Sequence, residues 1–312
     1  MTLLKVTEGK VPFAHPSLPA DSNPHTFYRI LGDISVAKPV VALHGGPGIP
    51  HGYLTPLFEH FHKQTKTPVI LYDQIGCGQS TRYPEKAGDE SFWTIALFAS
   101  ELDNLLEHLG VNEFDLYGHS WGGMLAAVVA TESSSPKLAH RVEKLVLASS
   151  PASMKLWATA QRAWLKGMSR EVQDAIEQAE KDNNYESKEY QDAVLEYYKV
   201  HLCRVWPFPQ ALADAFGELE KDPTVYMTMC GPSEITITGN LKDYDWIEES
   251  KQIKAPTLVI HGEFDEASTL VVEPWQNSIP SVQLVTLSDG AHIVHLEQLE
   301  KYSGLLERFL QG

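Results

Sequence analysis

Cysteine and positive charge are both scarce in this sequence. Its 312 residues include three cysteines, Cys77, Cys203 and Cys230, which lie far apart. An odd number of distant cysteines argues against a disulfide framework, and the absence of a C-x-x-C pair argues against a zinc site. Lysine and arginine number 25 against 41 acidic residues, so the formal net charge is −16. A chain this acidic repels phosphate, which argues against nucleic-acid and anionic-membrane partners.

Long apolar segments are missing as well. A membrane-spanning helix needs roughly 18 or more apolar residues, and the best stretch here, Met124–Ala130, is far shorter. The N-terminal sequence MTLLKVTEGK lacks the apolar core of a signal peptide. We therefore expect a soluble globular protein of the cytoplasm with no membrane partner.

Short apolar runs alternate with helical patterns in the first half of the chain. Residues 92–109 carry an apolar stripe with the 3.6-residue period of a helix. Apolar runs bounded by glycine-rich turns are typical of buried parallel strands. The alternation therefore predicts an α/β fold with a mostly parallel sheet. The four runs in this half are Val40–Leu43, Val69–Tyr72, Phe114–Tyr117 and Lys144–Ala148.

The strand pattern stops near residue 150 and resumes near residue 246. Residues 151–245 are rich in helix-forming and aromatic residues, and two more strands follow at 257–260 and 282–285. A closing amphipathic helix is expected at 297–310. We predict one core built from residues 1–150 and 246–312, with a helical cap inserted at 151–245.

A G-x-S-x-G sequence provides a candidate nucleophile. Residues 118–122 read GHSWG and lie between a predicted strand and an apolar helix. This arrangement is typical of a sharp turn that exposes the hydroxyl of its serine, here Ser120. Free N–H groups at the start of the following helix stabilise a developing oxyanion.

A second glycine-rich turn, HGGPG at residues 44–48, follows the first predicted strand. Acyl transfer by serine needs two N–H donors, of which one belongs to the residue after the nucleophile, Trp121. We assign the other to Gly46, with Gly45 as the next choice. A phosphate-binding loop is the alternative, but the sequence matches neither G-x-G-x-x-G nor the Walker A pattern.

An acid and a base follow the nucleophile in the order expected of a triad. Asp265 lies a turn beyond a predicted strand and is preferred over the neighbouring Glu263 and Glu266. His292 follows the next strand and is preferred over His295. Sites in α/β sheets form where the strands end, so these side chains are expected to meet.

Five motifs together resemble the proline iminopeptidase branch of the α/β-hydrolases, which includes serine aminopeptidases and amino-acid amidases. They are HGGPG, YDQIGCGQS, GHSWGG, HGEFDE and GAHIVHLE, and the resemblance spans residues 40–310. It implies an α/β-hydrolase core with a helical cap and release of N-terminal residues from short peptides or amides. By motif position it implies the same nucleophile, acid, base and oxyanion donors.

The cap carries one further match. Residues 231–239, GPSEITITG, resemble the family segment whose glutamate holds the free ammonium group of the substrate, which would be Glu234. Glu218 is a weaker second candidate. Two departures from the family pattern put a strict preference for proline in doubt. Ile75 stands where arginine is usual, and Ile-Pro-His follows HGGPG at residues 49–51.

The expected function is that of a serine aminopeptidase or amino-acid amidase acting on small peptides or amides through an acyl-enzyme. No cofactor is expected, and no H-E-x-x-H or similar spacing indicates a catalytic metal. An esterase, a lactonase or another acyl hydrolase is the alternative, because ester hydrolysis uses the same groups. A binding protein without activity is a third reading, which the presence of a complete triad disfavours.

Overall fold

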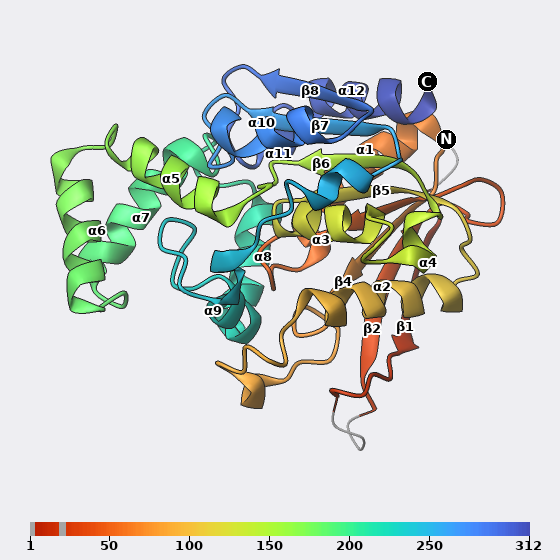
Figure 1. Ribbon diagram of the computed structural model, residues 1–312, viewed down its shortest axis with the longest axis horizontal. Helices are drawn as coiled ribbons and strands as arrows, with labels where there is room; N and C mark the ends of the chain where they lie inside the picture. Colours follow the sequence, from red (N-terminus) through yellow and green to blue (C-terminus); the bar gives the residue numbers. More distant parts are fainter. Residues whose placement is uncertain (1–3, 19–22) are drawn as a thin grey trace.

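A single sheet of eight strands organises the computed structural model, which describes residues 4–18 and 23–312 (Figure 1). The strand order is β1-β2-β4-β3-β5-β6-β7-β8. β1 pairs antiparallel with β2, and β2 pairs antiparallel with β4, whereas every later pairing is parallel. The strands are β1 (Val6–Pro12), β2 (His25–Leu31), β3 (Val40–Leu43), β4 (Val69–Asp73), β5 (Phe114–His119), β6 (Val142–Ala148), β7 (Thr257–Gly262) and β8 (Val282–Leu287).

Helices connect the strands and cover both faces of the sheet. The helices of the core are α1 (Thr55–Thr65), α2 (Ile95–His108), α3 (Trp121–Ala130), α4 (Pro136–Ala139), α10 (Thr269–Ser278), α11 (Val294–Glu297) and α12 (Leu299–Gln311). Short 3-10 turns lie at η1 (His51–Leu54), η2 (Pro84–Lys86), η3 (Asn240–Asp243) and η4 (Glu249–Gln252). The predicted α/β fold with a mostly parallel sheet is thereby confirmed.

Alternate residues of the central strands enter two separate apolar clusters. In β3, Val41 and Leu43 pack with α2 and α3, whereas Val40 and Ala42 pack with α1 and α12. All four side chains are fully buried. A strand that is buried on both faces needs apolar residues at every position, which explains why these strands read as continuous apolar runs.

The N-terminal hairpin is absent from the prediction. β1 has seven residues, of which only Val11 is buried, and it lies at the edge of the sheet. An edge strand with a solvated face has no continuous apolar run, so the criterion that identifies the buried parallel strands does not detect it.

Five helices lie between β6 and β7 in the sequence, where the cap is predicted. They are α5 (Met154–Leu165), α6 (Arg170–Asp182), α7 (Lys188–His201), α8 (Gln210–Lys221) and α9 (Thr224–Met229). α6 and α7 pack together and project to one side of the sheet (Figure 1). A single bridge pairs Ser153 with Asp245, so the chain enters and leaves this helical segment at one place. No helix of the described chain has the length and apolar character needed to cross a membrane.

A carboxyl group is buried in the core beneath the turn that follows β4. Glu101 of α2 is 0% exposed and accepts hydrogen bonds from Thr26 Oγ1 at 2.5 Å and from the Ile75 N–H at 2.9 Å. Burial raises the pKa of Glu101 to about 8, although both hydrogen bonds oppose the shift. This glutamate therefore joins β2, α2 and the β4 turn as a neutral acid at moderate pH.

Replacing Glu101 by glutamine should make stability less dependent on pH. In the unfolded chain the carboxyl loses its proton near its ordinary pKa of 4.5, whereas in the fold it retains the proton to about pH 8. The free energy of unfolding therefore falls as pH rises through this window, by on the order of a few kcal/mol. Glutamine does not titrate, so urea unfolding of Glu101→Gln should lack that fall. Glu107→Gln, an exposed site on the same helix, is the matched control. A wild-type slope in Glu101→Gln would contradict the prediction.

Candidate active site

Ser120 stands at the turn between β5 and α3 in a strained backbone conformation. Its φ is 55° and its ψ is −122°, in a region that non-glycine residues rarely occupy. Glycines on either side make this turn feasible because they allow backbone segments to meet. A Cβ on Gly118 would lie 2.2 Å from the Gly122 carbonyl oxygen, and one on Gly122 would lie 2.3 Å from that of Leu43. The start of α3 thus rests directly on the end of β3.

His292 and Asp265 meet at the same end of the sheet, beyond β8 and β7. His292 Nδ1 lies 2.7 Å from Asp265 Oδ1, and both side chains are buried. Asp265 also accepts hydrogen bonds from the N–H groups of Ala267 at 2.7 Å and Gly262 at 3.3 Å. These contacts hold the carboxylate rigidly and leave His292 Nε2 as the nitrogen that is free for proton transfer.

Buried carboxyl groups control the charge of this imidazole. Burial alone would lower the pKa of His292, but Asp265, followed by Glu266 and Glu234, raises it to about 9. Burial works against ionisation of Asp265, yet its partners, His292 first, lower the pKa of that carboxyl. The pair is therefore an ionised aspartate beside a histidine that is readily protonated.

Gly45 and Gly46 of the HGGPG turn line the same cavity as Ser120. Gly46 has a φ of +107°, and a Cβ there would lie 2.8 Å from the N atoms of Gly48 and Ile49. The neighbouring Gly45 N–H donates to the Tyr53 hydroxyl at 2.8 Å, so that N–H is already engaged. Trp121 is the first residue of α3, where backbone N–H groups have no partner within the helix.

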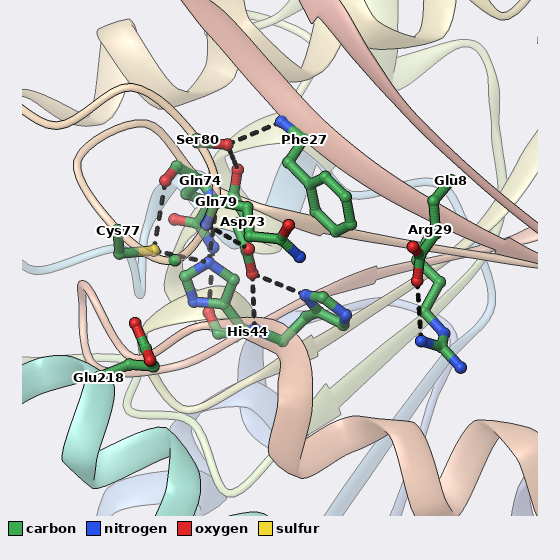
Figure 2. A network of polar contacts seen from close by, with 12 residues as sticks. Glu8, Phe27, Arg29, His44, Asp73, Gln74, Cys77, Gln79, Ser80 and Glu218 are labelled. Carbon is green, nitrogen blue, oxygen red and sulfur yellow. Dashed lines mark hydrogen bonds and ion pairs between the residues drawn. The ribbon is translucent and has the colours of Figure 1, made fainter.

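Gln74 and His44 connect the turns that follow β3 and β4 (Figure 2), and Gln74 also reaches the start of α3 after β5. The Gln74 side chain accepts a hydrogen bond from the Trp121 indole N–H at 2.8 Å and donates one to the His44 carbonyl at 3.1 Å. The His44 ring accepts the Gln74 backbone N–H at 2.9 Å. Burial lowers the pKa of His44 to about 4, so its ring stays neutral and keeps this accepting nitrogen.

A cavity of about 30 Å³ lies between the core and the cap, and Ser120, His292 and Glu234 all line it. Glu234 accepts a hydrogen bond from the Tyr226 hydroxyl at 2.9 Å. Trp157 of α5 packs against the His292 ring and donates its indole N–H to the Glu234 carbonyl at 2.8 Å. The structure therefore places Glu234 in the same cavity as Ser120 and His292.

Glu218, the second predicted glutamate, lies elsewhere. It pairs with Arg82 at 2.9 Å and with Lys221 on its own helix, and it is drawn apart from the buried network in Figure 2. It lines a separate cleft of about 530 Å³. Glu218 is not among the residues that line the cavity with Ser120, so the structure does not bring it together with the other predicted site residues.

Glu266 is the carboxyl group whose role the sequence does not reveal. It is 0% exposed, and neither of its carboxyl oxygens has a hydrogen-bond partner. Burial raises the pKa of Glu266 well above its ordinary value, and the neighbouring Glu234 raises it further. A buried polar group without a partner is costly and rare, so this carboxyl calls for an explanation beyond packing. Its place directly after Asp265 is the only signal that the sequence offers.

The cysteines and histidines do not form a metal site. Within residues 4–18 and 23–312, no group of three or more histidine, cysteine or acidic side chains is arranged to hold a metal ion. Cys77, Cys203 and Cys230 are each buried and free.

Comparison with known proteins places the chain among hydrolases. Residues 38–299 match the family model described as alpha/beta hydrolase fold. The proline iminopeptidase of Clostridium botulinum is 34% identical, and the alignment covers 98% of this chain and 99% of that protein. The crystal structure of VinJ is similar with a TM-score of 0.90 and 37% identity, covering 98% of each chain. The structure of proline iminopeptidase from Mycobacterium smegmatis has a TM-score of 0.86 and 34% identity, again over 98% of each chain.

Adding a methyl group at Gly122 should disrupt the nucleophile turn. Gly122→Ala forces its Cβ against the carbonyl oxygens at the end of β3, which cannot move without displacing the sheet. We expect a loss of about 1–3 kcal/mol or more in the free energy of unfolding, measured by urea denaturation. Gly304→Ala in α12 is the control, because its nearest neighbour is an Arg308 side-chain atom at 3.6 Å. It should leave stability unchanged or raise it slightly. Equal stability of the two variants would refute this account of the turn.

Proposed function

The chain belongs to the α/β-hydrolase family, in the branch of the proline iminopeptidases, and we propose that it is a serine aminopeptidase. It releases the N-terminal residue, proline or another apolar residue, from short peptides or amino-acid amides. The observation that carries this proposal is the buried carboxyl group of Glu234, which lines one cavity with Ser120 and His292. The buried Glu266 lies close enough to His292 and Glu234 to interact electrostatically with both. Asp265 binds His292.

In this mechanism Ser120 attacks the carbonyl carbon of the first residue. His292 takes the serine proton at Nε2, because its Nδ1 is held by Asp265. The ionised Asp265 stabilises the imidazolium that forms. His292 then donates the proton to the leaving amine, which departs as the acyl-enzyme forms. Water, activated by the same histidine, releases the amino acid.

The oxyanion of each tetrahedral intermediate is held by the N–H groups of Gly46 and Trp121. The engagement of Gly45 with Tyr53 favours Gly46 as the donor from the HGGPG turn. Removal of one such donor typically lowers the rate about 10²- to 10³-fold. Gln74 contributes indirectly, since it links the Trp121 side chain to the HGGPG turn.

The free ammonium group of the substrate docks on Glu234 and Glu266. Both groups have pKa values raised by burial, so an ammonium group favours their ionised forms and forms charge-assisted hydrogen bonds. A blocked amino terminus has no charge to compensate these carboxylates and is rejected. The bound cation also opposes the negative field on His292, which favours the neutral imidazole that acts as the base.

Entry of an aminoacyl group requires movement of side chains in the cap. The catalytic cavity is only about 30 Å³. A larger cleft of about 540 Å³ adjoins it in the cap, and Tyr198, Phe216 and Tyr226 line both spaces. Rotation of these aromatic side chains joins the cleft to Ser120 without any change in the sheet.

Ser120→Ala should abolish hydrolysis while leaving the fold intact. We expect aminoacyl-arylamide cleavage to fall at least about 10⁴-fold, since the residual activity of triad variants comes from binding and the oxyanion hole alone. The wild type should cleave free aminoacyl-arylamides but not their N-acetylated forms, measured beside simple esters. A preference for esters or for blocked substrates would instead indicate the esterase or lactonase alternative.

Glu234→Gln and Glu266→Gln should each weaken the selection of a free amine. Loss of one charged partner predicts a fall of about 10- to 100-fold in kcat/KM for free aminoacyl-arylamides. The same changes remove negative charge near His292, so its pKa falls. Phosphonylation of Ser120 by a fluorophosphonate needs the neutral imidazole, and the midpoint of its pH dependence should move from about 9 to lower pH. Glu218→Gln is the control, and an equal effect there would contradict the assignment.

A further inference from the structure

The short helix η1 after the HGGPG turn carries a tyrosine whose hydroxyl makes two buried hydrogen bonds. Tyr53 is 2% exposed. Its oxygen accepts the Gly45 N–H at 2.8 Å and lies 2.8 Å from His119 Nδ1. His119 immediately precedes the nucleophile and is 2% exposed. One phenol therefore contacts both the oxyanion turn and the nucleophile turn.

The direction of these hydrogen bonds follows from their partners. His119 Nε2 lies 3.0 Å from the His292 carbonyl oxygen, which can only accept, so the proton is on Nε2. His119 Nδ1 is then an acceptor, and the Tyr53 hydroxyl donates to it. Hydrogen bonds thus run from the Gly45 N–H through Tyr53 and His119 to the backbone of His292.

We propose that Tyr53, acting with His119, is a positioning residue that holds the oxyanion turn, the nucleophile turn and the base loop in register. This inference rests on the proposed function of Ser120 and His292. The three turns come from residues far apart in the sequence. Tyr53 also lines the cavity, but its hydroxyl is engaged by the Gly45 N–H and by His119. Its role is therefore to fix where the Gly46 N–H points relative to Ser120.

The Tyr53 hydroxyl is closely packed against the HGGPG turn, so the geometry of that turn is sensitive to loss of the hydroxyl. A Cβ at Gly45 would lie 3.0 Å from the Tyr53 hydroxyl oxygen and 3.1 Å from Ser120 Cβ. Loss of the hydroxyl leaves two buried groups without a partner, the Gly45 N–H and His119 Nδ1. The peptide at Gly45 then reorients to find another partner, and the adjoining Gly46 N–H moves with it.

η1 itself is anchored at its first residue. His51 donates its backbone N–H to Asp73 Oδ1 at 3.1 Å, and its ring Nδ1 lies 2.6 Å from the same oxygen. His51 is one of the residues after HGGPG that depart from the family pattern. The hydrogen bonds between His51 and Asp73, the last residue of β4, fix the start of η1. The Tyr53 hydroxyl is therefore held within hydrogen-bond distance of the Gly45 N–H.

His119 is suited to this task because it stays neutral. Burial, followed by the neighbouring His292 and His295, keeps the pKa of His119 well below its ordinary value. A neutral ring with its proton on Nε2 both donates to His292 and accepts from Tyr53. A cation at this place would also repel the imidazolium that forms on His292 during the reaction.

The test compares Tyr53→Phe with Tyr302→Phe. The Tyr302 hydroxyl makes its buried hydrogen bond of 3.0 Å to Tyr117 within β5, so the control loses the same kind of group without removing a hydrogen bond to any of the three turns. Tyr53→Phe should lower kcat about 10- to 100-fold on an aminoacyl-arylamide, with KM changed less than about twofold, because a misplaced donor affects the transition state alone. Tyr302→Phe should keep the wild-type kcat, although its Tm should fall about as much as that of Tyr53→Phe.

A double-variant cycle shows whether the two residues act as one unit. His119→Leu should lower kcat to a similar degree, and adding Tyr53→Phe to it should cost little more. A kcat for Tyr53→Phe within about twofold of wild type, an equal loss in Tyr302→Phe, or losses that multiply would overturn the inference. If Tyr53→Phe does not fold, His119→Leu against Tyr302→Phe carries the same comparison. Failure of a fluorophosphonate to label Ser120 in the wild type would instead refute the proposed function.

Discussion

Close contact between backbone segments at the ends of the parallel strands is the constraint on which the site depends. α3 begins directly against the last residue of β3, because Gly122 has no side chain to separate them. This contact forces Ser120 into its strained conformation and brings the start of α3 beside the HGGPG turn. Strain of this kind persists only where the surrounding structure over-determines it. Here the two buried faces of the sheet supply that rigidity.

Buried polar groups connect the rigid sheet to the turns that carry the site residues. Gln74, His44, Tyr53 and His119 each join two turns, and each makes its hydrogen bonds away from water. Because an unpaired polar group in the interior is costly, such bonds specify one arrangement of the turns rather than many. The groups that we propose to be catalytic are therefore positioned before a substrate arrives, and a preorganised oxyanion hole lowers a barrier without reorganising.

Electrostatics divides the carboxyl groups of the site into two kinds. Burial opposes ionisation of Asp265, but His292 lowers the pKa of that carboxyl and keeps it ionised. Burial raises the pKa of Glu234 and of Glu266 above the ordinary value. In the proposed mechanism the first kind supports the cation that forms on His292, and the second receives the cation that the substrate brings. The net charge of −16 at the level of the whole chain gives no indication of this division.

The sequence by itself determined the parallel strands, the order of the triad candidates and the turn around Ser120. These features depend on local patterns, namely apolar runs, glycine spacing and the position of a residue after a strand. Three features became visible only in the tertiary structure: β1 forms an edge strand, Glu218 lies apart from the site, and Glu266 is buried. The tertiary structure also located two residues that depart from the family pattern: the backbone N–H of Ile75 binds the buried Glu101, and the ring of His51 binds Asp73. Each of these depends on contacts between distant segments, and no local periodicity records which segments meet or which carboxyl groups lose water when they do.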